Sequence, residues 1–131
     1  KEFKKSQTLI SKKKIMKKLT IQQVLNCNRT LFKIFEQQST FPVSIGFKIF
    51  SIMKKFDEVE EYVFNVLEMT FQNIDFNSMT EQQKMFYNNI VSSEIELDFE
   101  TIDEKFFKEN ETVMLTIEDI SNLGIILKEK Q

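Results

Sequence analysis

With 131 residues, 41% of them hydrophobic, and fourteen phenylalanines, the chain can bury one real core, which excludes a disordered protein. It has no histidine, a single cysteine (Cys27) and no apolar run of roughly eighteen residues, which excludes an internal disulfide and a membrane-spanning helix. The net charge of −2 conceals two parts: thirteen of eighteen basic residues lie in 1–56, and eighteen of twenty acidic residues lie in 57–131. We therefore expect contacts driven by charge more than a chemical reaction.

The N-terminal segment is strongly basic. Residues 1–18 contain eight lysines and one glutamate with no sustained apolar period, so we expect a flexible arm there and one compact domain in 19–131. The lysines expected to contact a partner are Lys4, Lys5, Lys12, Lys13, Lys14, Lys17 and Lys18. That partner is a nucleic acid backbone, another protein or the acidic half of a second copy, and a solubilising tail is the alternative.

The length of this arm depends on where the natural chain starts. Met16 could be the natural start, which would make 1–15 an extension. Because the arm is expected to be unfolded by itself, deleting 1–15 should leave the melting temperature nearly unchanged. The same deletion should weaken partner binding, most of all at low salt.

A helical hairpin is predicted over residues 20–71. Thr20 followed by Gln23 forms a capping pattern for a helix over 21–37. The apolar stripe of this first helix consists of Ile21, Val24, Leu25, Asn28, Leu31, Phe32 and Phe35. Pro42 is suited to the start of a second helix, which should run to about residue 71, with Gly46 permitting close approach of the first helix. The apolar stripe of the second helix includes Ile45, Ile49, Ile52, Met53, Phe56, Val59, Val63, Val66 and Leu67. A short turn between two such helices makes them antiparallel.

The C-terminal part, 79–128, is predicted to mix helix and strand. A capping pattern at Thr80 predicts a third helix over about 81–92, and Thr116 begins a last short helix. Residues 94–100 alternate strictly between acidic and apolar side chains, as in a strand with one face on a core. Residues 112–115 are the expected partner strand. The predicted fold class is thus mainly α (α+β).

The acidic strand face is the second candidate binding surface. Its carboxylates are Glu94, Glu96, Asp98 and Glu100. They are either a solvated face that protects a strand edge or a contact for a basic partner. Since no histidine, neighbouring asparagine or glycine-rich loop completes a site, we expect no catalytic residue, no bound metal and no cofactor.

Two residues of the first helix, Cys27 and Asn28, are further candidate sites. Cys27 has no histidine to activate it, so a buried thiol at the edge of the core is expected rather than a nucleophile. Asn28 interrupts the apolar stripe, and we expect a buried amide bonded to the backbone of a neighbouring element, with ligand binding as the alternative.

Several stretches of the chain resemble a family of small uncharacterised bacteriophage proteins. The first are Lys18-Leu19-Thr20-Ile21, with Leu25, Asn28 and Leu31, and then Phe41-Pro42-Val43-Ser44 with Phe47-Lys48-Ile49. The closing section is Glu94-Ile95-Glu96-Leu97 with Ile102 and Leu115-Thr116 through Leu123. The resemblance covers about 17–127 and implies a gene among phage structural and tail genes, with no enzymatic activity. The basic arm, and the absence of a Gly/Asp/Asn-rich hairpin after the long helix, depart from the family pattern.

The resemblance, together with the missing catalytic residues and the opposed charge halves, implies a non-enzymatic bacteriophage protein, either a structural component of the virion or an assembly factor acting through protein–protein contacts. Its expected location is the virion or the host cytoplasm, with self-association and nucleic acid contact through the arm as further expectations. One alternative is an inhibitor of a host enzyme or defence system that uses the acidic half to mimic nucleic acid. Another is an accessory subunit of a large ribonucleoprotein that uses the basic arm.

Overall fold

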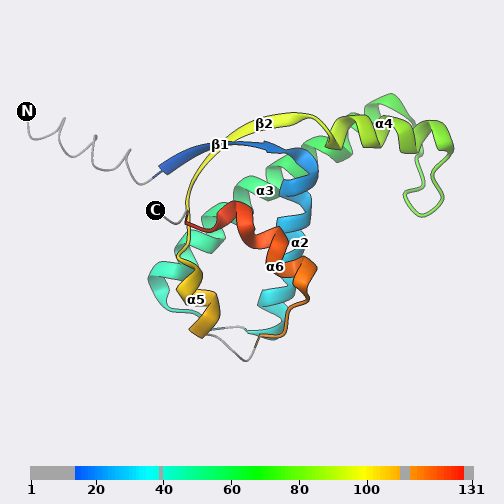
Figure 1. The fold of residues 1–131 in the computed structure, drawn as a ribbon. Coiled ribbons are helices and arrows are strands. Elements are labelled where there is room, and N and C mark those ends of the chain that lie inside the picture. Colours follow the sequence, from blue (N-terminus) through cyan, green and yellow to red (C-terminus); the bar gives the residue numbers. More distant parts are fainter. Residues whose placement is uncertain (1–13, 39, 110–112, 129–131) are drawn as a thin grey trace, which may run out of the picture.

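The computed structural model describes residues 14–38, 40–109 and 113–128, which form a mainly helical structure (Figure 1). Its elements are β1 (Lys14–Thr20), α2 (Ile21–Gln37), α3 (Val43–Thr70), α4 (Glu81–Val91), β2 (Glu94–Glu100), α5 (Glu104–Glu109), α6 (Ile117–Leu123) and the 3-10 turn η1 (Gly124–Ile126). Within these residues β1 and β2 form a two-stranded antiparallel sheet. The predicted mainly α (α+β) class is confirmed.

Three threonines begin helices as predicted, each through the same reciprocal pair of hydrogen bonds. Thr20 Oγ1 accepts from the backbone N–H of Gln23 at 3.1 Å, and Gln23 Oε1 accepts from the N–H of Thr20 at 2.9 Å. Thr80 and Gln83 repeat the arrangement at α4, and Thr116 begins α6 in the same way. Because these bonds satisfy orphan backbone donors locally, each helix begins at the residue that the sequence predicts.

The hairpin of α2 and α3 forms the centre of the molecule (Figure 1). The two helices pack along their apolar stripes, and Leu31, Ile49 and Phe56 are fully buried between them. The expectation that Gly46 admits a close approach of α2 is wrong. A Cβ added at this glycine would meet only the side chain of Phe41 within 4 Å, at an ordinary contact distance of 3.9 Å.

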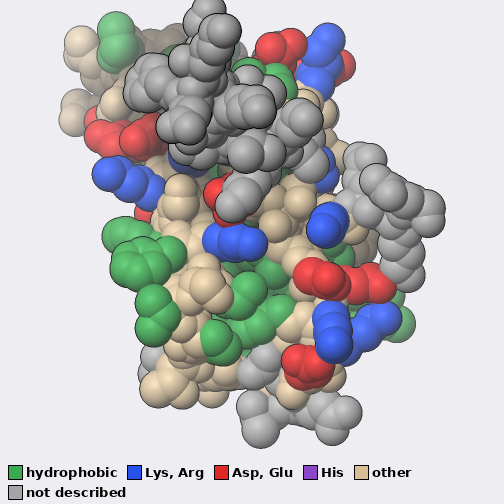
Figure 2. Space-filling view, turned by 90° about the vertical axis from the view of Figure 1, so that its left-hand side faces the viewer, with side chains coloured by type: hydrophobic (Ala, Val, Ile, Leu, Met, Phe, Trp, Pro, Cys, Tyr) green, Lys and Arg blue, Asp and Glu red, His purple; other side chains and the backbone are tan. Residues whose placement is uncertain are grey.

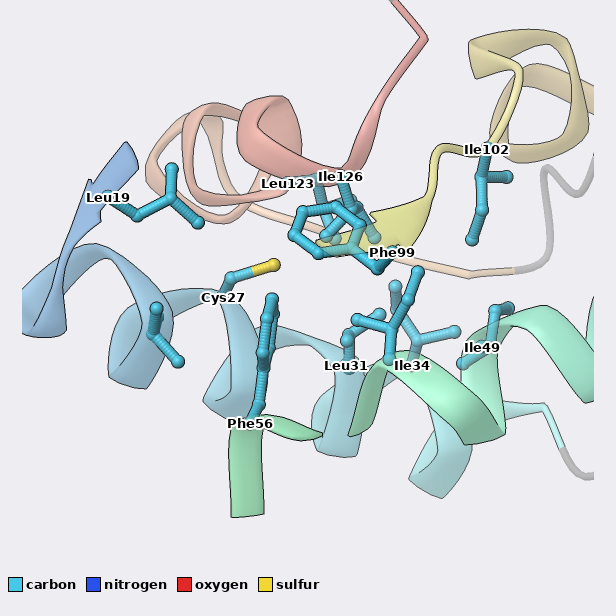
Figure 3. Packing of buried hydrophobic residues seen from close by; sticks show 12 residues of the cluster. Leu19, Cys27, Leu31, Ile34, Ile49, Phe56, Phe99, Ile102, Leu123 and Ile126 are labelled. Atoms are coloured by element: carbon cyan, nitrogen blue, oxygen red, sulfur yellow. The ribbon is translucent and has the colours of Figure 1, made fainter. Parts of the chain in front are cut away.

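Residues far along the chain complete this core. The ring of Phe99, in β2, packs edge-on against Phe56 with the ring centroids 5.8 Å apart (Figure 3). Ile102 and Ile126 are buried in the same cluster. The Ile102 N–H donates to the Ile126 carbonyl, and the Lys128 N–H donates to the Ile102 carbonyl, both at 2.8 Å. The C-terminal segment is therefore held against the end of β2 by backbone bonds as well as by burial.

In the sheet, β1 from the N-terminal segment pairs with β2. Its register sets Leu19 opposite Ile95 and Lys17 opposite Leu97. Leu19 is buried in the main cluster. Lys17 lies two residues earlier, on the same strand face, and its Nζ donates to the carbonyl of Ile125 at 2.8 Å. A lysine can occupy this inward position because its stem is apolar and its charged end reaches a polar partner.

This pairing corrects two expectations. The predicted partner strand, 112–115, is wrong, because 113–115 forms no strand and residue 112 lies outside the described residues. The boundary of the arm is also wrong, because 14–18 belongs to β1. The lysine-rich composition of 14–18 concealed a strand that pairs with an acidic one, and such pairing cannot be read from either segment alone. The remainder of the expected arm, 1–13, lies outside the described residues.

The short helix α5 was not expected from the sequence. It has six residues, fewer than a helix needs for stability on its own. Packing supplies the missing stability, since the Phe106 ring lies 5.8 Å from that of Phe41, which precedes α3. Phe41 in turn packs edge-on against Phe35 of α2 at 5.0 Å. These aromatic contacts tie α5 to the end of the hairpin.

An ion pair fastens α6 to α2. Lys33 Nζ lies 2.5 Å from Asp119 Oδ2, and the same carboxylate oxygen accepts from the Thr116 N–H at 3.0 Å. The hydrogen bond from Lys33, followed by those from Thr116, lowers the pKa of Asp119 from 3.8 to about 2. The charged form of Asp119 therefore favours the folded state.

Asp119→Asn should reduce the free energy of unfolding at pH 7 by about 1 kcal/mol, a value typical of a partly exposed ion pair. Since the folded-state pKa lies below the unfolded one, the contribution is present above pH 3.8 and is lost as the pH falls through about 2. Urea unfolding of both proteins across this range measures the difference. A gap between wild type and variant that stays constant down to about pH 2 would contradict the assignment.

Candidate functional site

The acidic strand face is partly neutralised by lysines of α3. Lys55 Nζ lies 3.0 Å from Asp98 Oδ1 and also donates to the Asp98 carbonyl oxygen. Lys48 Nζ lies 3.7 Å from Glu100 Oε2. Lys55 therefore contacts both the backbone and the side chain of β2, whereas Lys48 contacts a side-chain carboxylate only. The C-terminal half of the expected acidic contact surface is therefore engaged within the chain.

β1 pairs along the whole of this strand, and the N-terminal half of the acidic face makes no ion pair with α3 among the described residues. Glu94 and Glu96 are exposed, and the register sets them opposite Thr20 and Lys18. Opposite charges directly across a strand pair contribute roughly 0.2–1 kcal/mol. The basic segment thus meets the acidic strand of its own chain, whereas a second copy was among the expected partners.

The described residues do not test the partner contacts of the remaining arm lysines. Lys4, Lys5, Lys12 and Lys13 lie outside the described residues, and Lys14 is placed only by its backbone, opposite Glu100. Their contact with a partner stays a prediction.

Cys27 and Asn28 are both buried in α2. Desolvation raises the pKa of the Cys27 thiol to about 12, which keeps it neutral at pH 7 and unreactive. Asn28 Nδ2 donates to Asp57 Oδ1 at 2.8 Å and to Glu60 Oε2 at 3.4 Å. The amide is buried as expected, but the predicted bond to a backbone group is wrong, because its partners are carboxylates of α3. Asn28 Oδ1 has no hydrogen-bond partner among the described residues.

Neither a metal-binding cluster nor a membrane-spanning helix is found among the described residues. They contain no group of three or more histidine, cysteine, aspartate or glutamate side chains placed to hold a metal ion. In the same part of the chain, no helix combines the length and the apolar character needed to cross a bilayer.

A pocket of about 480 Å³ opens between α2, α3, the 72–80 loop and α4. It is lined by Leu25, Arg29, Phe32, Glu60, Val63, Phe64, Leu67, Phe76, Met79 and Tyr87. Most of these side chains are apolar, and two are charged. Mostly apolar pockets of about 300–1,000 Å³ with a few polar groups are typical of ligand sites.

Local bonds in the loop place one wall of this pocket. Asn73 adopts a left-handed backbone conformation with φ of 58°. Asp75 then accepts from the N–H of Asn77 at 2.9 Å and from Ser78 Oγ at 2.8 Å. The bond from Ser78, followed by that from Asn77, lowers the pKa of Asp75. This turn holds Phe76 against the ring of Phe64, with centroids 4.8 Å apart.

The two charged residues of the pocket differ in their side-chain contacts. Glu60 is contacted by the buried amide of Asn28. The Arg29 side chain is exposed, and its guanidinium makes no ion pair or hydrogen bond with the described residues. Sequence reasoning missed the site because Leu25 and Phe32 were assigned to the core stripe. Their spacing with Arg29, at i, i+4 and i+7, was the available signal.

A second exposed surface lies on the N-terminal half of α3, and we call it the α3 stripe. It consists of Val43, Phe47 and Phe50, whose exposed fractions are 74%, 72% and 60%. With Gly46 they line a shallow apolar groove of about 410 Å³. Hydrophobic side chains are exposed on the corresponding face of the molecule (Figure 2). The core side of this part of α3 is also apolar, so sequence periodicity assigned no special role to the outer side.

No family model matches the chain, and no curated protein or solved structure is similar to it at a significant level. The resemblance to bacteriophage proteins stays a prediction.

Proposed function

We propose that the chain works as a non-enzymatic binding protein and that the α3 stripe is its contact with another protein. The observation that carries the proposal is the exposure of Val43, Phe47 and Phe50 side by side on one helix face. Leaving three large apolar side chains in water forfeits roughly 1.5–3 kcal/mol each relative to burial. Contiguous exposed apolar surface of this kind is typical of interaction sites.

The charges beside the α3 stripe select the chemistry of the partner. Residues 43–55 contain three lysines and no acidic residue. Lys48 and Lys55 are paired with β2, whereas Lys54 has no carboxylate partner among the described residues. An amphipathic helix with an apolar face and a carboxylate at one end complements this surface. A second copy of the chain fits less well, because a symmetric contact would bring like charges together.

The biological role that we propose for this contact is in a bacteriophage. An assembly factor or structural component of a virion acts through such contacts, in the virion or in the host cytoplasm. Support comes from the sequence resemblance and from the exposed α3 stripe. Mass spectrometry of purified virions tests the structural version, which would be abandoned if the protein were not detected.

The alternative of nucleic acid mimicry by the acidic half has less support. Asp98 and Glu100 are engaged by lysines of α3, and Glu96 lies opposite Lys18. A mimic of a phosphate backbone needs a row of carboxylates that is not neutralised by its own chain.

Phe47→Ser should weaken binding of the partner at least about tenfold if this side chain is central to the interface. Because Phe47 is exposed, the melting temperature should change little. The measurement is recovery of interacting proteins from host lysate with tagged protein, followed by titration of the purified partner.

Met69→Ser is the matched control, because Met69 is 85% exposed on the same helix but outside the α3 stripe. The proposal requires a partner that is lost with Phe47→Ser and kept with Met69→Ser. Equal recovery with both variants would refute it, and concentration-dependent dimerisation abolished by Phe47→Ser would identify a second copy instead.

A further inference from the structure

We infer that the pocket between α2, α3 and α4 binds a small amphipathic anion: an apolar, preferably aromatic body with one carboxylate or comparable acidic group. This inference uses residues outside the α3 stripe and does not depend on the proposed protein contact. It rests on the shape of the pocket, on the state of its two charged residues and on its aromatic wall.

The shape favours a small molecule over a flat protein contact. Four segments converge on the pocket, and its volume of about 480 Å³ is enough for a compact organic ligand. Its floor contains the buried side chains Val63 and Leu67 of α3. Those two residues also belong to the second buried cluster, which joins α4 to the hairpin. The floor is therefore fixed by packing and is formed before any ligand arrives.

The charge in the pocket favours an anion. Glu60 receives the amide of Asn28, which uses part of its capacity to accept hydrogen bonds. Arg29 lines the same pocket without a carboxylate partner among the described residues. A guanidinium presents a rigid fork of donors that matches a carboxylate, and such charge-assisted bonds are among the strongest available to a ligand.

The wall of the pocket favours an aromatic or other flat apolar body. Phe32, Phe64 and Phe76 line the pocket and remain partly exposed to solvent. The Phe64 and Phe76 rings meet at 63°, which leaves an angled apolar surface. Covering these rings removes apolar area from water, while Arg29 holds the charged end of the ligand.

A matched pair of fluorescent probes tests the inference on the full chain. One is 8-anilino-1-naphthalenesulfonate, and the other is N-phenyl-1-naphthylamine, which has the same aromatic body without the anionic group. Arg29→Gln should weaken binding of the sulfonate roughly tenfold, the size of one lost charge-assisted hydrogen bond. Binding of the neutral amine should stay within about twofold, because its contacts are apolar.

Two further variants test whether the affinity for the sulfonate follows the charge of the pocket. Arg29→Lys should retain most of the sulfonate affinity, because it retains the positive charge. Glu60→Gln should tighten sulfonate binding a few-fold, because it removes a negative charge from the pocket while Asn28 can still donate to the amide oxygen. Competition by 4-phenylbutyrate, but not by 4-phenyl-1-butanol, would extend the result to carboxylates.

Lys54→Gln is the control for binding at the α3 stripe, where Lys54 offers another exposed cation. The inference stands if Arg29→Gln, but not Lys54→Gln, separates the two probes. It is overturned if Arg29→Gln weakens both probes equally or neither, or if only Lys54→Gln affects the sulfonate. None of these outcomes bears on whether Phe47→Ser loses a protein partner, so the two proposals fail separately.

Discussion

Phe56→Ala should lower the free energy of unfolding by about 3–5 kcal/mol, the usual cost of emptying a buried aromatic site. Phe56 has no exposed surface and contacts the ring of Phe99, so the lost side chain leaves a cavity between α3 and β2. Leu31→Ala, on the facing helix, should cost about 2–5 kcal/mol for the same reason. Urea unfolding followed by circular dichroism measures both.

Phe50→Ala is the matched control, since it removes the same side chain from an exposed position of α3. It should change the free energy of unfolding by no more than about 0.5 kcal/mol. If Phe56→Ala changed the free energy of unfolding as little as this control, that result would contradict the packing of β2 against the hairpin.

Removing the N-terminal strand should have a comparable effect. A chain that starts at Thr20 loses β1, and with it the burial of Leu19 and the strand ladder to β2. Burial of a leucine contributes about 2 kcal/mol, and each ladder hydrogen bond contributes about 1 kcal/mol. We therefore expect a loss of about 4 kcal/mol or more, measured by urea unfolding.

The companion deletion of 1–13 keeps β1 intact and should leave the melting temperature nearly unchanged. The earlier expectation that deleting 1–15 is harmless no longer holds, because that deletion removes the first two residues of β1. The salt-dependent loss of partner binding is now expected for the deletion of 1–13. Equal stability of the chains starting at residues 14 and 20 would show that β1 does not contribute to the fold.

The local structure was determined by the sequence itself. Thr20, Thr80 and Thr116 each form a hydrogen-bonded cap with a residue three positions later, so the starts of α2, α4 and α6 depend on neighbours only. The alternation in 94–100 likewise predicts a strand without reference to the rest of the chain. Short-range signals of this kind can be read from one sequence.

Only the tertiary structure decided which segments meet. β2 pairs with 14–20, about eighty residues away, and neither segment specifies its partner, because register depends on both faces of the sheet and on the core beneath it. The six-residue α5 exists because Phe106 packs on Phe41.

The candidate sites also combine features that the sequence shows with features that only tertiary packing decides. The sequence placed Leu25 and Phe32 on an apolar stripe and Cys27 inside, and the burial of Cys27 is confirmed. It could not show that Leu25, Arg29 and Phe32 line an open pocket, since that depends on how far α4 and the 72–80 loop extend over the hairpin. Periodicity identifies the faces of a helix that are apolar, whereas the packing of distant elements decides which apolar face is covered and which is left for a ligand.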